Sequence, residues 1–190
     1  MSYLPKRQNI RNPYHDYGQP GSYFITIDIR LGQCLFGKAK SETEIELNPL
    51  GQVAKDLWQS IPIHFPHVLL GKLIVMPNHI HGIIHIGSHT ESDRPLQNGN
   101  IDLPFIVDHS ANAISNQFGP LKKGSLAVIM GQYKAAVTRW ANNNRFGGLF
   151  DWHARFYDRI IKDKDALMAA EKYIEQNPEK WWAKYGNKQW

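Results

Sequence analysis

Apolar and polar residues alternate most clearly in the segment from Ser22 to Arg30. This period of two predicts a β-strand with one buried face. A turn at Gly32 and the segment Glu44–Leu47 predict a short second strand. The apolar positions of the first strand are Tyr23, Ile25, Ile27 and Ile29.

Three later segments carry apolar residues at helical spacing. Each has a polar residue that can cap its start, and a proline or an asparagine- and glycine-rich stretch that can end it. The predicted helices run from Asn48 to Pro62, from Ser125 to the asparagines after Trp140, and from Asp163 or Asp165 to Pro178.

Two further segments, Gly71–Ile86 and Arg155–Lys162, are predicted to be strands. Pro77 and Asn78 interrupt the first, which is therefore a kinked strand or a pair of strands. The order of elements predicts an α+β fold of the ferredoxin-like, split βαβ type. Its antiparallel sheet would have helices on one face, and the other face would be free to hold a site.

The chain has 190 residues, enough for one hydrophobic core and short for two, so we expect a single domain. Periodicity is lost over residues 87–124, and a loop of this length predicts a mobile insertion. Residues 1–20 are expected to form an N-terminal arm, and residues 179–190 a C-terminal tail.

The basic residues are unevenly distributed. Lysines and arginines number 22 against 17 aspartates and glutamates, a net charge of +5. Residues 120–190 hold 13 basic and 7 acidic residues, whereas the first 119 residues hold 9 and 10. This surplus favours an acidic partner such as nucleic acid, although solvated surface lysines explain it about equally well.

Cysteine content and hydropathy bear on the compartment. Cys34 is the only cysteine of the sequence, which excludes an internal disulfide and a cysteine-rich zinc site and fits a reducing environment. The sequence has no run of about 18 apolar residues and no signal-peptide core near its start. We therefore expect a cytoplasmic protein with no membrane partner.

His79 and His81 are separated by one residue, so both imidazoles project from the same face of a strand, with Cα atoms about 7 Å apart. Such a pair can bind one metal ion. Two histidines at this spacing also arise often by chance as ordinary, partly exposed strand residues, and the pair alone favours that reading.

Tyr173 and Asn177 are four residues apart and therefore share one face of the last predicted helix. The apolar stripe of this helix lies beside Tyr173, so the hydroxyl can reach a site from the rim of the buried surface. An ordinary rim aromatic and a C-terminal cap before Pro178 would give the same pattern.

Four segments in this order resemble the REP-associated tyrosine transposases, a bacterial branch of the single-tyrosine HUH transposases. They are VMPNHIHGIIHI, GSLAVIMGQYKAAVTRW, FDWHARFYDRIIKD and AEKYIEQNPEKW. The resemblance covers most of the chain and fails only across residues 87–124. It implies a ferredoxin-like fold, in agreement with the order of elements.

The resemblance also implies functions for individual residues. The family's histidine pair, which matches His79 and His81, binds a divalent metal ion, and Mg²⁺ or Mn²⁺ suits such a site. The family's nucleophilic tyrosine matches Tyr173. A polar residue four positions later completes the metal site and matches Asn177.

Two other tyrosines compete as nucleophiles. Tyr133 lies on a predicted helix, and Val137, four residues later, offers no metal ligand. Tyr157 is predicted on a strand between Arg155 and Arg159, where stacking or backbone contacts suit it better. Tyr173 alone has an oxygen ligand one helical turn away.

The implied activity is metal-dependent cleavage and rejoining of single-stranded or hairpin DNA through a 5′-phosphotyrosine, by a monomer or a homodimer. A tyrosine hydroxyl, with a pKa of about 10, is a weak nucleophile at neutral pH, and a metal ion that polarises the phosphate would compensate. Trp152 or Phe156 can stack bases, although Trp152 is more typical of a core residue. The candidate phosphate contacts are Lys122, Lys123, Lys134, Arg139, Arg155, Arg159 and Lys162.

Two alternatives remain at this point. One is a module of the same fold that binds hairpin DNA or RNA without cleaving it. The other is a metal-dependent hydrolase of small molecules, which lacks a carboxylate that the sequence can place beside the histidine pair.

Overall fold

The computed structural model describes residues 17, 19–87 and 123–186. Most of the predicted arm and insertion, the end of the predicted tail, and Lys122 lie outside this range. The described elements are β1 (Gly21–Asp28), η1 (Arg30–Gly32), β2 (Gly37–Ala39), β3 (Ile45–Leu47), α1 (Pro49–Gln59), α2 (Ile61–His64), β4 (Val68–Val75), β5 (His79–Ile86), α3 (Leu126–Asn142), β6 (Tyr157–Ile161), α4 (Lys164–Glu175) and α5 (Asn177–Tyr185).

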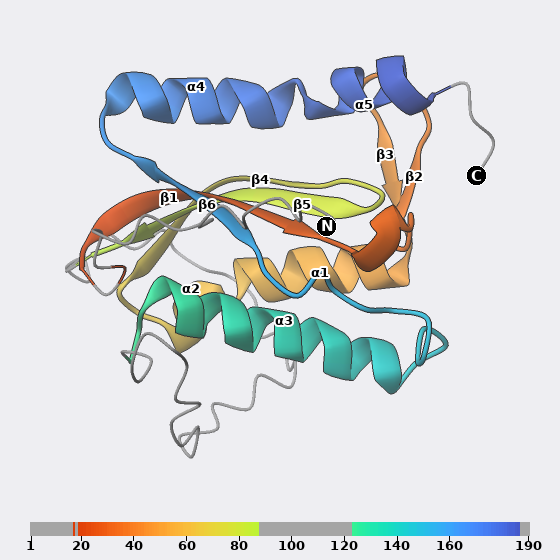
Figure 1. Ribbon diagram of the computed structural model, residues 1–190, viewed down its shortest axis with the longest axis horizontal. Coiled ribbons are helices and arrows are strands. Elements are labelled where there is room, and N and C mark those ends of the chain that lie inside the picture. The colour runs from red at the N-terminus through yellow and green to blue at the C-terminus, as the bar shows by residue number, and fades with distance from the viewer. Residues whose placement is uncertain (1–16, 18, 88–122, 187–190) are drawn as a thin grey trace, which may run out of the picture.

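A four-stranded sheet of order β4-β5-β1-β6 forms the centre of the described residues (Figure 1). All three of its strand pairs are antiparallel. The segment Gly71–Ile86 is resolved as a pair of strands, β4 and β5, joined by a turn at Pro77 and Asn78. The ferredoxin-like prediction is confirmed. The strands β2 and β3 form a separate two-stranded sheet.

The main core lies between the sheet and the helices α1 and α3. Tyr23, Ile25 and Ile27 of β1 are fully buried there, as the alternation of this strand predicts. The Asn48 side chain accepts a hydrogen bond from the backbone N–H of Gly51 and caps α1, which matches the predicted helix start.

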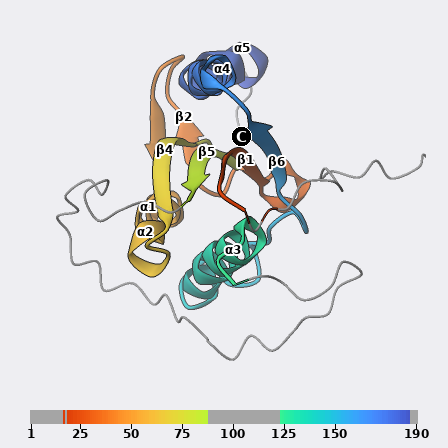
Figure 2. The same ribbon diagram turned by 90° about the vertical axis from the view of Figure 1, so that its left-hand side faces the viewer.

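The expectation that helices cover only one face of the sheet is wrong. Figures 1 and 2 show α1, α2 and α3 on one face and α4 and α5 on the other. The physical reason is a second apolar cluster, in which Ile83 of β5 packs with Ala170 and Ile174 of α4, with Phe24 of β1 beside them. The site face of the sheet is therefore partly covered by α4.

The predicted C-terminal tail also needs correction, because residues 179–185 belong to α5. The preceding helix α4 ends at Glu175, and Pro178 lies in the first turn of the new helix instead of following the old one. Proline lacks a backbone N–H and is tolerated in the first turn of a helix. None of the described helices combines the length and apolarity needed to cross a bilayer.

Candidate active site

Strand register brings the site residues together on the face that α4 crosses. Across the β1–β5 pair, Thr26 lies opposite His81 and Asp28 lies opposite His79. Across the β1–β6 pair, Thr26 lies opposite Tyr157. The inward-facing residues of β1 pack into the main core, so Thr26 and Asp28 remain on the same face as the histidine pair.

The two histidines form a compact pair. Their ring centroids are 4.6 Å apart, at an interplanar angle of 70°. Nδ1 of His81 and Oγ1 of Thr26 share a hydrogen bond of 2.8 Å, and Nδ1 of His79 lies 2.7 Å from Oδ1 of Asn78. Partners on Nδ1 fix the ring orientation, so that Nε2 of each ring is the nitrogen that could bind a metal ion.

Asn177 reaches this pair from the junction between α4 and α5. Its side chain is buried, and Oδ1 lies 3.3 Å from Nε2 of His79. Trp181, one turn further along α5, covers the same ring at a centroid distance of 5.7 Å. The short break between the two helices thus turns Asn177 toward the sheet.

Tyr173 lies on the last turn of α4, directly above the sheet. Its ring centroid is 5.2 Å from that of His81 and 5.7 Å from that of Phe24, in edge-on contacts. The side chain remains 41% exposed, so a large substrate can reach the hydroxyl. Nζ of Lys180 lies 4.8 Å from the ring centroid and places a positive charge beside it.

Burial keeps both histidines uncharged. It lowers the pKa of His81 to about 3, and repulsion by His79 adds to the effect. Burial also lowers the pKa of His79, although the negative charge of Asp28 and the contact with Asn177 partly oppose this. Neutral imidazole is the form that binds metal ions.

The donor set fits a divalent cation. Both ring nitrogens of His79 face amide oxygens, yet a neutral imidazole has a single N–H. If the proton is on Nδ1 of His79, this nitrogen donates the shorter hydrogen bond, to Oδ1 of Asn78. Nε2 of His79 and Oδ1 of Asn177 then both present lone pairs, as two ligands of one cation do. Within the described ranges, no three His, Cys, Asp or Glu side chains converge, so such a site depends on the amide oxygen of Asn177.

The competing tyrosines lie elsewhere or lack the ligands. Tyr133 is fully buried and donates a hydrogen bond from its hydroxyl to the backbone oxygen of Ala54 at 2.9 Å, which makes it a core residue. Tyr157 is exposed on β6 and stacks on His153 at a centroid distance of 6.3 Å. Of these tyrosines, only Tyr173 contacts the histidine pair.

The predicted phosphate contacts fall into two groups, one at β6 and one at α3. Arg159 lies on β6 opposite Phe24, and Arg155 and Lys162 flank this strand as exposed side chains. The other candidate phosphate contacts that the structure describes belong to the α3 region, and α3 lies on the sheet face opposite α4 (Figure 1). They are Lys123, just before α3, and Lys134 and Arg139 within it.

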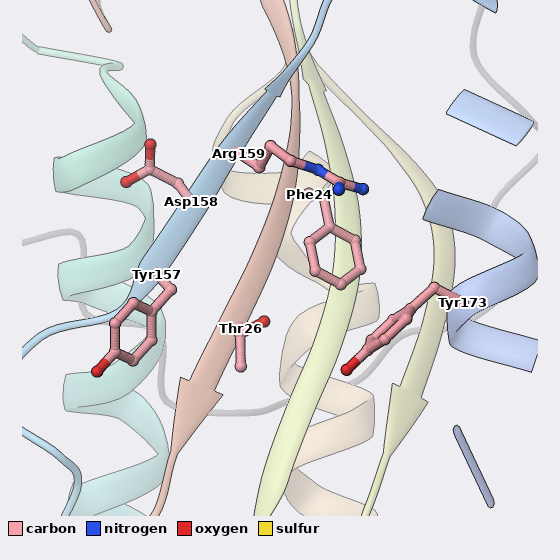
Figure 3. Close-up of a pocket in the computed structure, with 6 residues that line it drawn as sticks. All are labelled: Phe24, Thr26, Tyr157, Asp158, Arg159 and Tyr173. Carbon is pink, nitrogen blue, oxygen red and sulfur yellow. The ribbon is translucent and has the colours of Figure 1, made fainter. Parts of the chain in front are cut away.

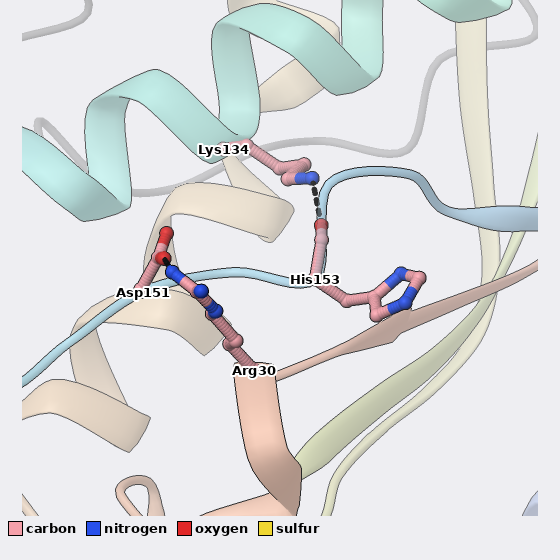
Figure 4. Close-up of polar contacts among 4 residues, drawn as sticks. All are labelled: Arg30, Lys134, Asp151 and His153. Atoms are coloured by element: carbon pink, nitrogen blue, oxygen red, sulfur yellow. Dashed lines mark hydrogen bonds and ion pairs between the residues drawn. The ribbon is translucent and has the colours of Figure 1, made fainter.

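Lys134 has a structural environment, which Figure 4 shows. Its ammonium donates to the backbone oxygen of His153 at 2.8 Å, and burial lowers its pKa. It also lies 5.9 Å from the ring centroid of Trp152, which is buried in the core. Trp152 is therefore not available to stack on bases.

A small pocket opens beside Tyr173, between β1, β6 and α4 (Figure 3). Sequence reasoning named Tyr157, Arg159 and Tyr173 but missed the other half of its wall, because the wall depends on register across three elements. Phe24 offered one signal, since it is an aromatic residue at a position of β1 that alternation assigns to the polar face. The pocket is lined by Phe24, Thr26, Tyr157, Asp158, Arg159 and Tyr173.

Comparisons with known proteins identify relatives by sequence and by fold. No family model matches the chain. An uncharacterized protein of Haemophilus influenzae is 34% identical over 181 residues, which are 92% of this chain and 89% of that protein.

Among solved structures, that of a REP-associated tyrosine transposase bound to a REP hairpin aligns with a TM-score of 0.51. The alignment covers 90% of this chain and 74% of that chain at 16% identity, which shows a shared fold. A structure from Deinococcus radiodurans covers 87% of this chain and 95% of that one at 12% identity. Its TM-score of 0.43 is too low to carry an argument.

Proposed function

This chain belongs to the same family as the uncharacterized Haemophilus influenzae protein, and from this family, its transposase fold and its site we propose a single-strand DNA transposase. It would cleave and rejoin hairpin or palindromic DNA through a phosphotyrosine. One observation carries the proposal. Tyr173 and Asn177, from the α4–α5 segment, lie against the histidine pair of β5.

The nucleophile of the reaction is the Tyr173 hydroxyl, which is exposed enough to meet a phosphodiester. Its oxygen forms a bond to phosphorus as its proton leaves, and the bond from phosphorus to the 3′-oxygen breaks. The 3′-oxygen takes up a proton, and the 5′-phosphate stays on the tyrosine. Attack by another 3′-hydroxyl reverses these steps, so rejoining needs no other source of energy.

Positive charge near the reacting phosphate comes from the chain itself and from a bound cation. Lys180 lies against the Tyr173 ring, and Arg159 lies over Phe24, the next ring along the sheet. His79, His81 and Asn177 would hold Mg²⁺ or Mn²⁺, which would supply Lewis-acid polarisation of the phosphate. Charge stabilisation of this kind is a main source of rate acceleration in phosphoryl transfer.

Single-stranded or hairpin DNA is the substrate that we propose. The site lies on the sheet face that α4 only partly covers, and its pocket reaches the edge strand β6, on or beside which Arg155, Arg159 and Lys162 are exposed. A flexible single strand can follow such an edge, and its phosphates can pair with these cations. The structural neighbour was solved with a REP hairpin, which supports the same choice of substrate.

A covalent adduct tests the proposal directly. Purified protein is incubated with a labelled DNA hairpin that has single-stranded flanks, in the presence of Mn²⁺ or Mg²⁺, and a denaturing gel detects labelled protein. We expect an adduct with the natural chain and with Tyr17→Phe, the matched control, whose ring stacks on the core residue Tyr23 outside the site, and none with Tyr173→Phe. EDTA should abolish it.

The outcomes separate the proposal from its alternative. An adduct that survives Tyr173→Phe would exclude Tyr173 as the nucleophile. Tight binding of the hairpin without an adduct under any divalent cation would instead select a DNA- or RNA-binding module of the same fold.

A further inference from the structure

The pocket beside Tyr173 has no role in the proposed reaction as described so far. It lies over Phe24 and Thr26 on β1, with β6 on one side and the Tyr173 ring on the other (Figure 3). Its volume is about 220 Å³. Sites for whole small-molecule ligands commonly measure about 300–1,000 Å³, so this pocket suits one unit of a chain that continues beyond it.

The chemistry of the wall is that of a nucleotide site. Arg159 lies with its guanidinium 5.5 Å from the ring centroid of Phe24, which holds the charge in place over the pocket. Tyr157 stands at the rim with 44% of its surface exposed, and Thr26 adds a small hydroxyl side chain. The remaining wall residue, Asp158, points its carboxylate away from Arg159 and Phe24 (Figure 3).

Two ring contacts relate the Arg159 charge to the proposed nucleophile. The ring centroids of Phe24 and Tyr173 are 5.7 Å apart, and the guanidinium of Arg159 lies 5.5 Å from the Phe24 centroid (Figure 3). Because Arg159 lies over a different ring from the nucleophile, it can bind a phosphate next to the one that Tyr173 attacks. The histidine pair and Asn177 remain available for the attacked phosphate itself.

We propose that this pocket is a nucleotide subsite, in which Arg159 binds the phosphate adjacent to the scissile one. The sugar and base between these two phosphates lie over Thr26, with Tyr157 at the rim as a stacking surface. Phe24 acts as a positioning residue that fixes the guanidinium. The inference rests on the proposed function, and it predicts which phosphate of the substrate this side chain contacts.

The test combines a protein variant with a modified substrate. Binding is measured in the Tyr173→Phe background, with the labelled hairpin carrying one neutral methylphosphonate at a time around the position of the wild-type adduct. Arg159→Gln should weaken binding of the unmodified DNA roughly tenfold, as expected for loss of a charged hydrogen bond. A methylphosphonate in place of the phosphate next to the scissile one should weaken DNA binding by a similar factor in the protein that retains Arg159. The same substitution should leave DNA binding by Arg159→Gln almost unchanged.

Arg145→Gln is the matched control, because Arg145 also lies over an aromatic ring, that of Phe146, at 5.4 Å, but outside the pocket. It should leave both binding and the methylphosphonate pattern unchanged. Arg159→Lys, which keeps the charge, should recover part of the binding. Urea unfolding of each variant confirms that folding is intact.

Three results would overturn the subsite. One is an equal loss with Arg145→Gln, and another is a methylphosphonate effect that Arg159→Gln does not remove. In both cases the wild-type adduct still forms, so the proposed function stands. The third is the absence of any adduct or DNA binding in the natural chain, which refutes the proposed function and the subsite together.

Discussion

His81 shows how one residue can serve both the site and the fold. It is 4% exposed, it shares a hydrogen bond with Thr26, and its ring contacts those of Phe24 and Tyr173. This environment disfavours the protonated ring and lowers the pKa to about 3. The same burial that keeps the imidazole neutral, as the proposed metal site requires, therefore makes the folded state sensitive to acid.

The pKa of His81 predicts a loss of stability between pH 7 and pH 5. In the unfolded chain this histidine binds a proton below its ordinary pKa of 6.5, whereas in the folded chain it stays neutral until about pH 3. Stability is therefore lost as the pH falls below 6.5, by about 2 kcal/mol at pH 5 from this residue. Urea unfolding in EDTA at the two pH values measures the difference.

His81→Gln is the control for this effect, because glutamine does not titrate. The variant should lose a smaller part of its free energy of unfolding between pH 7 and pH 5 than the natural chain does. An equal loss in both proteins would show that His81 is not the source.

The sequence predicts some site residues and not others for a physical reason. His79, His81, Tyr173 and Asn177 belong to short motifs in which strand or helix periodicity places each pair on one face. Lys180 lies seven residues from Tyr173 but across the break between two helices, so periodicity alone does not place it. Phe24 and Arg159 become neighbours only through the register of β1 and β6.

At the level of elements, the contact between β5 and α1 depends on a glycine. A Cβ atom at Gly82 would lie 2.3 Å from Cζ2 of Trp58, a side chain that is 1% exposed in the main core. The indole cannot move away, because it is packed against the ring of Tyr133 at 5.3 Å. This strand and this helix can therefore approach so closely only with glycine at position 82.

Gly82→Ala should lower the free energy of unfolding by about 1–3 kcal/mol, the usual cost of overpacking a core. Gly131→Ala is the matched control, because no atom lies within 4 Å of the added Cβ. Gly131 lies within α3, where alanine is favoured, so that change should stabilise the protein by up to about 1 kcal/mol. Chemical denaturation compares the two, and equal effects would contradict the packing argument.

The elements differ in how well sequence periodicity predicts them. The alternation of β1 and the cap at Asn48 depend on neighbouring residues, and both appear as expected. The position of α4 on the second face depends on the packing of Ala170 and Ile174 against Ile83, which is distant from both of them in sequence. The helix α5 was missed because Pro178 is compatible with the end of one helix and with the start of the next.

At the scale of the whole molecule, the main hydrophobic core and the candidate site lie on opposite faces of the sheet. One face packs against α1 and α3 and contains most of the buried apolar residues, while the other carries the histidine pair under α4 and α5. The edge strand β6 brings Arg159 to the second face. Lys134 is on the first face, which explains why the basic surplus of residues 120–190 is not a single surface.

The helices α4 and α5 lie over β5 of the same chain. This arrangement predicts that one chain forms a complete active centre by itself. Oδ1 of Asn177 lies 3.3 Å from Nε2 of His79, and the Tyr173 ring contacts His81, all within one chain. Each chain therefore holds its own proposed nucleophile and its own candidate metal site. If these are the working partners, two chains with different defects cannot repair each other.

Mixing Tyr173→Phe with His81→Gln protein should consequently give no adduct beyond that of the separate variants. The measurement is the adduct assay with labelled hairpin DNA, with an equal mixture of the natural chain and Tyr173→Phe as the control for inhibition by inactive protein. Recovery of the adduct in the mixture of the two variants would show that Tyr173 of one chain works with His81 of another. The α4–α5 segment would then have to exchange between chains during the reaction, because the intact chain already places it on its own sheet.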